Sequence, residues 1–158
     1  MSRNLRLLAI APIALALGGV GSAAAADHST AAASRAGAKV RLVHTKLGRV
    51  LADGSGRTVY IFGKDKGRRS RCFHACAAAW PPLTTHGRPV AGHGVRASKL
   101  GTTKRGHGVR QVTYNGHPLY GFVNDSGRRQ THGEGVNAFG GIWHVVSRSG
   151  KAAGAPGS

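Results

Sequence analysis

Acidic residues are scarce in this 158-residue chain. Five Asp and Glu face 23 Lys and Arg, which gives a formal net charge of +18; the five are Asp27, Asp53, Asp65, Asp125 and Glu134. Such an excess of positive charge attracts polyanions, although the Lys and Arg form no single dense run. We therefore expect a basic surface that contacts an anionic envelope polymer or a protein partner, and no specific nucleic-acid partner.

An apolar run long enough to span a membrane is also absent. Residues 7–21 form an apolar stretch of about 15 residues, whereas a bilayer needs roughly 20. The stretch follows Arg3 and Arg6 and precedes the small residues 22–26, which is the layout of a secretory signal peptide. We expect residues 1–26 to be a signal peptide cleaved within 22–27, so that the protein is secreted or held in the cell envelope without a stable membrane span. An uncleaved N-terminal anchor is the alternative.

Cysteine occurs twice, at Cys72 and Cys76, and neither directly follows the apolar run, so lipoprotein-type lipidation is not expected. Export favours oxidation of thiols, and we expect a disulfide between the two. Since His74 lies between them, a thiolate and imidazole site for a soft metal ion is the alternative. A closed zinc site needs four ligands and this stretch offers three, so we expect no metal site and no cofactor.

The sequence has no Gly-x-Ser-x-Gly elbow, no phosphate-binding loop and no dinucleotide-binding fingerprint. Its nine histidines form no ligand pair of the His-x-x-x-His kind, and His86, His93 and His107 lie in Gly-rich stretches. No enzyme class is indicated, and no residue is assigned a catalytic role.

The nine aromatic residues all fall between positions 60 and 143, which indicates where the core lies. Residues 27–39 and 148–158 contain none and are rich in small residues. We therefore expect a flexible lead-in at 27–39, one domain at 40–147 and a disordered tail at 148–158. We expect this domain to be a monomer.

Short apolar stretches separated by turn residues predict β-structure. Strands are expected at 39–45, 49–53, 57–62, 109–114, 117–122 and 141–147. Turns at 53–56 and at Asn115-Gly116 predict two hairpins, since Gly and Asn tolerate positive φ. Residues 73–80 are Ala-rich and precede Pro81-Pro82, which predicts one short helix, and 85–108 is expected to be mostly loop. The predicted fold class is mainly β: two tandem pseudo-symmetric β-hairpin units, about 47–83 and 108–146, form one small domain.

The pattern Tyr-x-Phe-x-x-Asp-x-Gly-Arg-Arg occurs at residues 60–69 and again at 120–129. Its repeated residues are Tyr60, Phe62 and Asp65, and Tyr120, Phe122 and Asp125. Residues i and i+2 of a strand share one face, so the Tyr and Phe residues are expected in the core together with Trp80 and Trp143. Duplication of this kind is typical of a unit that cannot bury its apolar face alone.

The repeated carboxylates, Asp65 and Asp125, have two interpretations. Each stands between a strand and a Gly, where Asp accepts backbone hydrogen bonds in a turn. Each is also followed by Arg-Arg, and pairing with Arg would lower the pKa of the carboxyl, the wrong direction for a general acid. We expect a structural role; the alternative is an acid/base pair like that of glycosidases.

Four ordered stretches resemble a bacterial family of exported proteins: the motif at residues 60–65, and residues 72–83, 111–125 and 140–143. That family is described as a secreted repeat of unknown function, or as predicted lipoproteins with a Tyr-x-(Phe/Trp/Tyr)-x-x-Asp motif. The resemblance implies a tandem β-rich repeat outside the cytoplasm and carries no established activity. Membrane tethering is not implied for this chain, because it lacks the Cys that would be lipidated.

The sequence therefore favours an exported, non-enzymatic binding or structural module with a strongly basic surface. One alternative is an extracytoplasmic redox or metal-handling accessory protein that uses Cys72, His74, Cys76 and the loop histidines. The other alternative is a hydrolase that uses Asp65 and Asp125.

Overall fold

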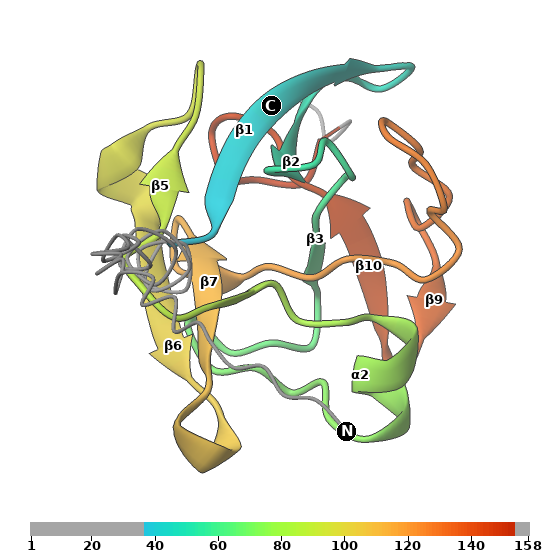
Figure 1. Cartoon of the computed structure of the whole chain (residues 1–158). Coiled ribbons are helices and arrows are strands. Elements are labelled where there is room, and N and C mark those ends of the chain that lie inside the picture. Colours follow the sequence, from blue (N-terminus) through green and yellow to red (C-terminus); the bar gives the residue numbers. More distant parts are fainter. Residues whose placement is uncertain (1–36, 154–158) are drawn as a thin grey trace, which may run out of the picture.

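A computed structural model describes residues 37–153 (Figure 1). The predicted signal peptide, nearly all of the lead-in and residues 154–158 lie outside the described residues. The elements are β1 (Lys39–Thr45), β2 (Gly48–Asp53), β3 (Tyr60–Phe62), α2 (Ala75–Ala79), β4 (Thr84–Thr85), β5 (Val90–Ala91), the 3-10 turn η1 (Ala97–Lys99), β6 (Leu100–Lys104), the 3-10 turn η2 (Gly106–Gly108), β7 (Arg110–Tyr114), β8 (His117–Pro118), β9 (Asn137–Ala138) and β10 (Gly141–Val145). The predicted mainly β fold with one short helix is confirmed.

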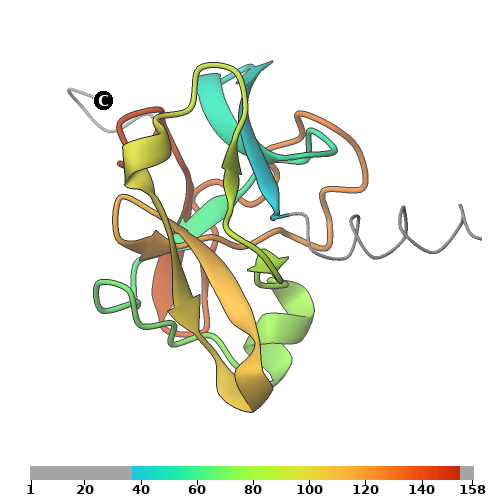
Figure 2. The same ribbon diagram turned by 60° about the vertical axis from the view of Figure 1, so that its left-hand side comes forward.

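The strands form several small sheets rather than one large one. Their orders are β2-β1-β5, β3-β10-β9 and β4-β7-β6, with β8 added to β7. The β1–β2 pair (cyan) lies above the β6–β7 pair (yellow to orange) in both Figure 1 and Figure 2. Between residues 37 and 153, no helix is long and apolar enough to cross a membrane.

The hairpin expected at Asn115-Gly116 is confirmed. Both residues have positive φ, 49° and 82°, which is the backbone twist that a two-residue hairpin turn needs. Next to the turn, Tyr114 pairs with His117 and Thr113 with Pro118.

The hairpin expected between 49–53 and 57–62 forms only beside its turn. Asp53 N–H donates to Arg57 O at 2.9 Å and Val59 N–H donates to Leu51 O at 3.1 Å, but β2 pairs along its whole length with β1 instead. From Tyr60 onward the chain leaves β2, and β3 pairs with β10. This route brings the β3 aromatic rings into the core.

The expectation that 85–108 is mostly loop was wrong, because the segment contains β6. This strand pairs antiparallel with β7 from Leu100 to Lys104. Its sequence, LGTTK, has a single large apolar residue and so carries no alternating apolar pattern. Pairing with the more apolar β7 supplies the stabilisation that the local sequence does not indicate.

Residues 148–153, which composition assigned to a disordered tail, instead fold back on the domain. Ser147 N–H donates to Lys151 O at 2.9 Å, and Ala153 N–H donates to Val145 O at 2.8 Å. Ala153 is buried against the core as a result.

Each unit begins earlier than the predicted starts near 47 and 108, because an antiparallel strand pair opens it: β1 with β2 in the first unit and β6 with β7 in the second. β1 and β2 place Arg41 opposite Ala52, and β6 and β7 place Thr102 opposite Val112, which lies 60 positions after Ala52. The units meet where Tyr60 and Tyr120 form an antiparallel bridge, with N–H to O distances of 2.8 and 3.0 Å. The bridge joins the two copies of the repeated pattern to each other, so the pseudo-symmetry of the fold passes through it.

Four aromatic rings stack at the centre of the core. In order they are Phe62, Trp143, Trp80 and Phe122, with ring centroids 4.1, 3.9 and 4.0 Å apart. Neighbouring rings in this stack come from different units, and both Trp side chains are fully buried. Since each aromatic pair contributes about 1 kcal/mol beyond its buried area, the stack ties the units together.

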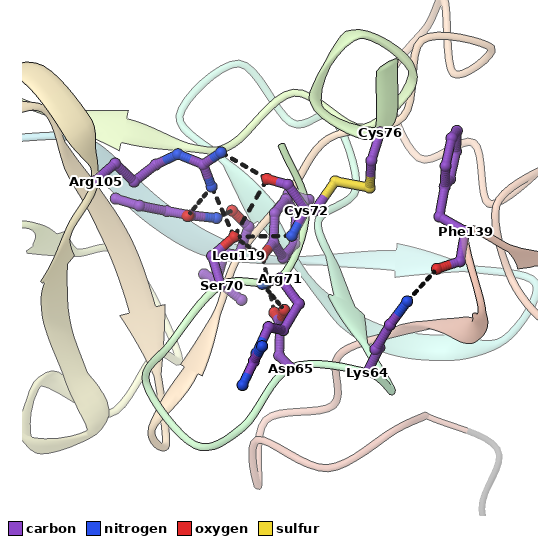
Figure 3. The surroundings of a disulfide bond; sticks show 11 residues. Lys64, Asp65, Ser70, Arg71, Cys72, Cys76, Arg105, Leu119 and Phe139 are labelled. Atoms are coloured by element: carbon purple, nitrogen blue, oxygen red, sulfur yellow. Dashed lines mark hydrogen bonds between the residues drawn. A yellow bond between two sulfur atoms is a disulfide. The ribbon is translucent and has the colours of Figure 1, made fainter. Parts of the chain in front are cut away.

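The predicted disulfide between Cys72 and Cys76 is confirmed (Figure 3). It precedes and enters α2, a helix of five residues that is too short to be stable alone. Closing so small a loop stabilises the fold by about 2 kcal/mol in the chain-entropy model. The residue between the cysteines, His74, has φ +53°, a conformation that few non-glycine residues adopt.

Candidate functional site

The repeated motif forms two crossed hydrogen bonds between the units. Tyr60 Oη donates to Asp125 Oδ2 at 2.5 Å, and Tyr120 Oη donates to Asp65 Oδ2 at 2.8 Å. The Tyr of each unit therefore bonds to the Asp of the other unit. Both Tyr side chains are fully buried.

The second oxygen of each carboxylate closes the loop that follows its own strand. Asp65 Oδ1 accepts the Arg71 N–H at 2.7 Å, and Asp125 Oδ1 accepts the His132 N–H at 3.1 Å. His132 Nδ1 also lies 3.1 Å from Asp125 Oδ1. Each Asp thus holds its own loop and the Tyr of the other unit at the same time.

The Arg-Arg dipeptides do not pair with these carboxylates, contrary to the sequence-based argument. Among the described residues, the ion pairs within 4.0 Å are His132–Asp125 and His144–Glu134. The pKa of Asp65 is also raised rather than lowered, because the cost of burying its charge exceeds the effects of the Arg71 N–H and the Tyr120 hydroxyl.

Both crossed tyrosines are held in the neutral form. Burial raises the pKa of each hydroxyl above its ordinary value, and at Tyr60 the hydrogen bond to Asp125 raises it further. A neutral Tyr donates a hydrogen bond to a carboxylate and keeps its proton. Each Tyr–Asp pair is therefore suited to a structural role. The occupied carboxylate oxygens favour the turn interpretation of Asp65 and Asp125 over the acid/base interpretation.

Arg105 is a structural residue that the sequence did not indicate. It lies just after β6, and its guanidinium donates to Ser70 Oγ (2.8 Å), Gln111 Oε1 (2.8 Å) and Cys72 O (2.6 Å) (Figure 3). The same group lies 4.5 Å from the centre of the Phe73 ring. Arg105 therefore ties the second unit to the disulfide loop of the first. It was missed because its segment was expected to be loop.

Some of the histidines considered for a metal site share a cavity in pairs, but the cysteines do not join them as ligands. Both cysteines are oxidised in the disulfide, which removes the thiolate ligands that a soft metal would need. His74 and His107 line a cavity of about 340 Å³, and His86 and His107 line a neighbouring one of about 670 Å³. Within residues 37–153, no three His, Cys, Asp or Glu side chains are placed to hold one metal ion.

A third cavity, of about 350 Å³, lies beside the crossed motif. Its lining includes Arg57, Pro82 and Phe122, and Asp125 reaches it. Both oxygens of that carboxylate are already engaged, by Tyr60 and by His132. Asp53, which also lines the cavity, is partly exposed and uses Oδ1 to accept the N–H groups of its own turn.

The four carboxylates between residues 37 and 153 are all engaged by groups other than the side chains of Lys and Arg. Asp53 Oδ1 accepts the N–H groups of Ser55, Gly56 and Arg57 at 2.9 to 3.0 Å. Glu134 accepts the Val145 N–H at 2.6 Å and lies 2.9 Å from His144 Nδ1. Asp65 and Asp125 each accept a Tyr hydroxyl and a backbone N–H.

The cationic side chains of the same region therefore lack carboxylate partners. Of the 23 Lys and Arg, Arg3, Arg6 and Arg35 lie outside the described residues, which leaves 20. None of these 20 forms an ion pair with a carboxylate between residues 37 and 153. In the folded domain the few carboxylates accept hydrogen bonds, and the Lys and Arg side chains remain unneutralised.

Comparison with known proteins identifies the family. A family model described as a secreted repeat of unknown function matches residues 41–84 and 101–147, which together make up more than half of the chain. The first match begins in β1, at Arg41, and the second begins in β6, at Gly101. No curated protein and no solved structure matches. The protein therefore belongs to this family of secreted repeats of unknown function, and its location is extracytoplasmic, as the sequence predicted.

Proposed function

We propose that the protein is a non-enzymatic extracytoplasmic module whose basic surface binds a linear anionic polymer that carries phosphate groups. The observation that carries this proposal is the set of 20 Lys and Arg that have no carboxylate partner among the described residues. A surface with so few internal ion pairs keeps its positive potential for a partner.

The excess of positive charge has an energetic consequence. Like charges on a compact domain repel one another, which lowers the stability of the folded state. A polyanion relieves this repulsion and releases its own counterions when it binds. Arg suits phosphate in particular, because its planar guanidinium donates two parallel hydrogen bonds to phosphate oxygens.

The crossed motif and the aromatic stack supply the rigidity of the module. We propose that the Tyr-x-Phe-x-x-Asp motif of each unit is a joint between units and that the domain acts as a monomer. The same arrangement argues against the hydrolase alternative, since Asp65 and Asp125 are each held by a Tyr and a backbone N–H. The disulfide argues against the metal alternative, since neither Cys72 nor Cys76 is a free thiolate.

Chromatography of the mature chain on immobilised linear polyphosphate tests the proposal. The mature protein, which we propose begins within residues 22–27 or directly after them, should be retained at low salt and eluted by salt. A column of neutral dextran is the control and should not retain it. Passage through the polyphosphate column at low salt, or equal retention on dextran, would reject the proposed function.

A further inference from the structure

Two arginines from different units meet beside Gly56, in the turn after β2. A Cβ atom placed on Gly56 would lie 3.1 Å from Arg41 Nη2 and 3.5 Å from Cδ of Arg128. The two side chains are therefore close neighbours, although 87 positions separate them in the sequence. Gly56 lets the two side chains come this close, since a Cβ there would crowd Arg41 Nη2, and the exposed Arg128 side chain keeps one side of the pair accessible to a ligand.

Backbone contacts hold both arginines in place. Arg129 N–H donates to Gly56 O at 3.1 Å, which fixes the loop that carries Arg128 against this turn. Arg41 lies in β1 and pairs with Ala52 of β2. The arginine pair is therefore fixed by a sheet on one side and by an anchored loop on the other.

No carboxylate neutralises this pair within the described region. The nearest Asp in the turn, Asp53, uses Oδ1 to accept the N–H groups of Ser55, Gly56 and Arg57 and forms no ion pair with Arg41 or Arg128. The Nε of Arg41 is in addition buried without a hydrogen-bond partner. A buried donor without a partner is uncommon and points to a missing acceptor.

The repeated pattern also supplies a matched single arginine. Arg68 stands at the position of the first copy that Arg128 occupies in the second. A Cβ placed on Gly101 would lie 2.8 Å from Arg68 Nη2, and the three atoms nearest to it belong to Arg68 and Thr113. The strand residue that pairs as Arg41 does is Thr102, opposite Val112, so no arginine takes the place of Arg41 beside Arg68.

We propose that Arg41 and Arg128 form an anion site that binds one phosphoryl group of a polymer chain. This inference rests on the proposed function and specifies where on the basic surface the polymer is recognised. Two guanidinium groups of this kind bind a phosphoryl group with charge-assisted hydrogen bonds. A bound phosphoryl group also removes the repulsion between the two positive charges.

The test compares three single variants, each of which removes one positive charge: Arg41→Gln, Arg128→Gln and, as the matched control, Arg68→Gln. Binding of fluorescein-labelled linear polyphosphate is measured by fluorescence anisotropy at about 0.15 M ionic strength. We expect Arg41→Gln and Arg128→Gln each to weaken binding about tenfold, since each removes a charge-assisted contact. Arg68→Gln should weaken it less than about threefold, because it lowers only the general field.

The double variant of Arg41 and Arg128 should bind nearly as well as either single variant, because the two residues act on one phosphoryl group. Melting temperatures show whether each variant folds. If Arg41→Gln fails to fold, Arg128→Gln decides the question, since the Arg128 side chain is exposed.

Equal weakening by Arg68→Gln and Arg128→Gln would overturn the arginine site and leave the proposed function standing. Absence of wild-type binding would overturn both. Poly(glycerol phosphate) and a single-stranded oligonucleotide, measured in parallel, distinguish the sources of the phosphoryl group. The site predicts that Arg128→Gln weakens binding more than Arg68→Gln for whichever polymer the wild type binds most tightly, and the reverse order would contradict it.

Discussion

Removing the Tyr60 hydroxyl tests the crossed motif. In Tyr60→Phe, Asp125 loses its Oδ2 donor, and the Gly133 N–H loses an acceptor at 3.3 Å. The Asp125 side chain is 1% exposed, so water has little access to replace the lost donor. A hydrogen bond to a buried charged group is worth about 3 kcal/mol, which for a domain of this size lowers the melting temperature by about 12 °C.

The loss in the free energy of unfolding is measured by urea titration, and two other tyrosine variants set the scale for it. Tyr120→Phe removes the donor to Asp65, which is only half-buried and can be solvated, so we expect a loss of about 1.5 kcal/mol. Tyr114→Phe removes a hydrogen bond from an equally buried Tyr to the backbone carbonyl of Arg148, which is a neutral acceptor. We expect this variant to lose about 1 kcal/mol of unfolding free energy. If Tyr60→Phe costs no more than Tyr114→Phe, the crossed hydrogen bond is not a joint between the units.

Three further predictions concern pH and the interface between the units. The raised pKa of Asp65 means that ionisation of this carboxyl opposes folding. The stability of the wild type relative to Asp65→Asn should therefore increase as pH falls from above the folded-state pKa to below 3.8. A constant difference in the free energy of unfolding across this range would show that burial does not oppose the ionisation of Asp65. The raised pKa values of Tyr60 and Tyr120 predict a trend of the same sign in alkali: stability falls as pH rises, and each Tyr adds a loss of about 1.4 kcal/mol per pH unit above 10. Tyrosinate absorbance from these two residues should appear only as the protein unfolds, and its appearance in the folded state would be the contrary result. Arg105→Ala should destabilise the domain by about 3 kcal/mol through three lost hydrogen bonds. Arg105→Lys should recover less than half of this loss, because one ammonium group cannot donate in all the directions of a planar guanidinium. Full recovery in urea titrations would show that the charge alone matters.

Local features of the fold were readable from the sequence. Asn115-Gly116 specifies a two-residue turn because both residues accept positive φ, and the structure has this turn. The pairing of Cys72 and Cys76 follows from export and from the absence of any other cysteine. In both cases the information lies within a few residues of the chain.

Features that depend on residues far away along the chain could not be predicted from the sequence. β6 has the sequence LGTTK and is a strand because β7 pairs with it, not because of its own composition. Arg105 was passed over for the same reason, since its acceptors come from Ser70, Cys72 and Gln111. The sequence could not indicate which backbone and side-chain groups this guanidinium would meet.

The repeat was identified correctly, but its chemistry was assigned to the wrong neighbours. Proximity along the chain suggested that Asp65 pairs with Arg68 or Arg69, whereas the structure pairs it with Tyr120 of the other unit. Both tyrosines were placed in the core by the i, i+2 pattern, and a buried Tyr hydroxyl needs an acceptor. The two buried hydroxyls and the two carboxylates of the motif were therefore a signal of crossing, although the sequence does not state which Tyr meets which Asp.

The salt dependence of polyphosphate binding decides whether the unpartnered Lys and Arg bind the polymer. The dissociation constant of the wild-type mature chain is measured by anisotropy over a series of salt concentrations. If unpartnered Lys and Arg bind the polymer, the logarithm of the association constant falls linearly with the logarithm of salt concentration, with a slope of magnitude about 3 or more. A slope near zero, or no binding even at the lowest salt concentration, would show that these side chains do not bind the polymer.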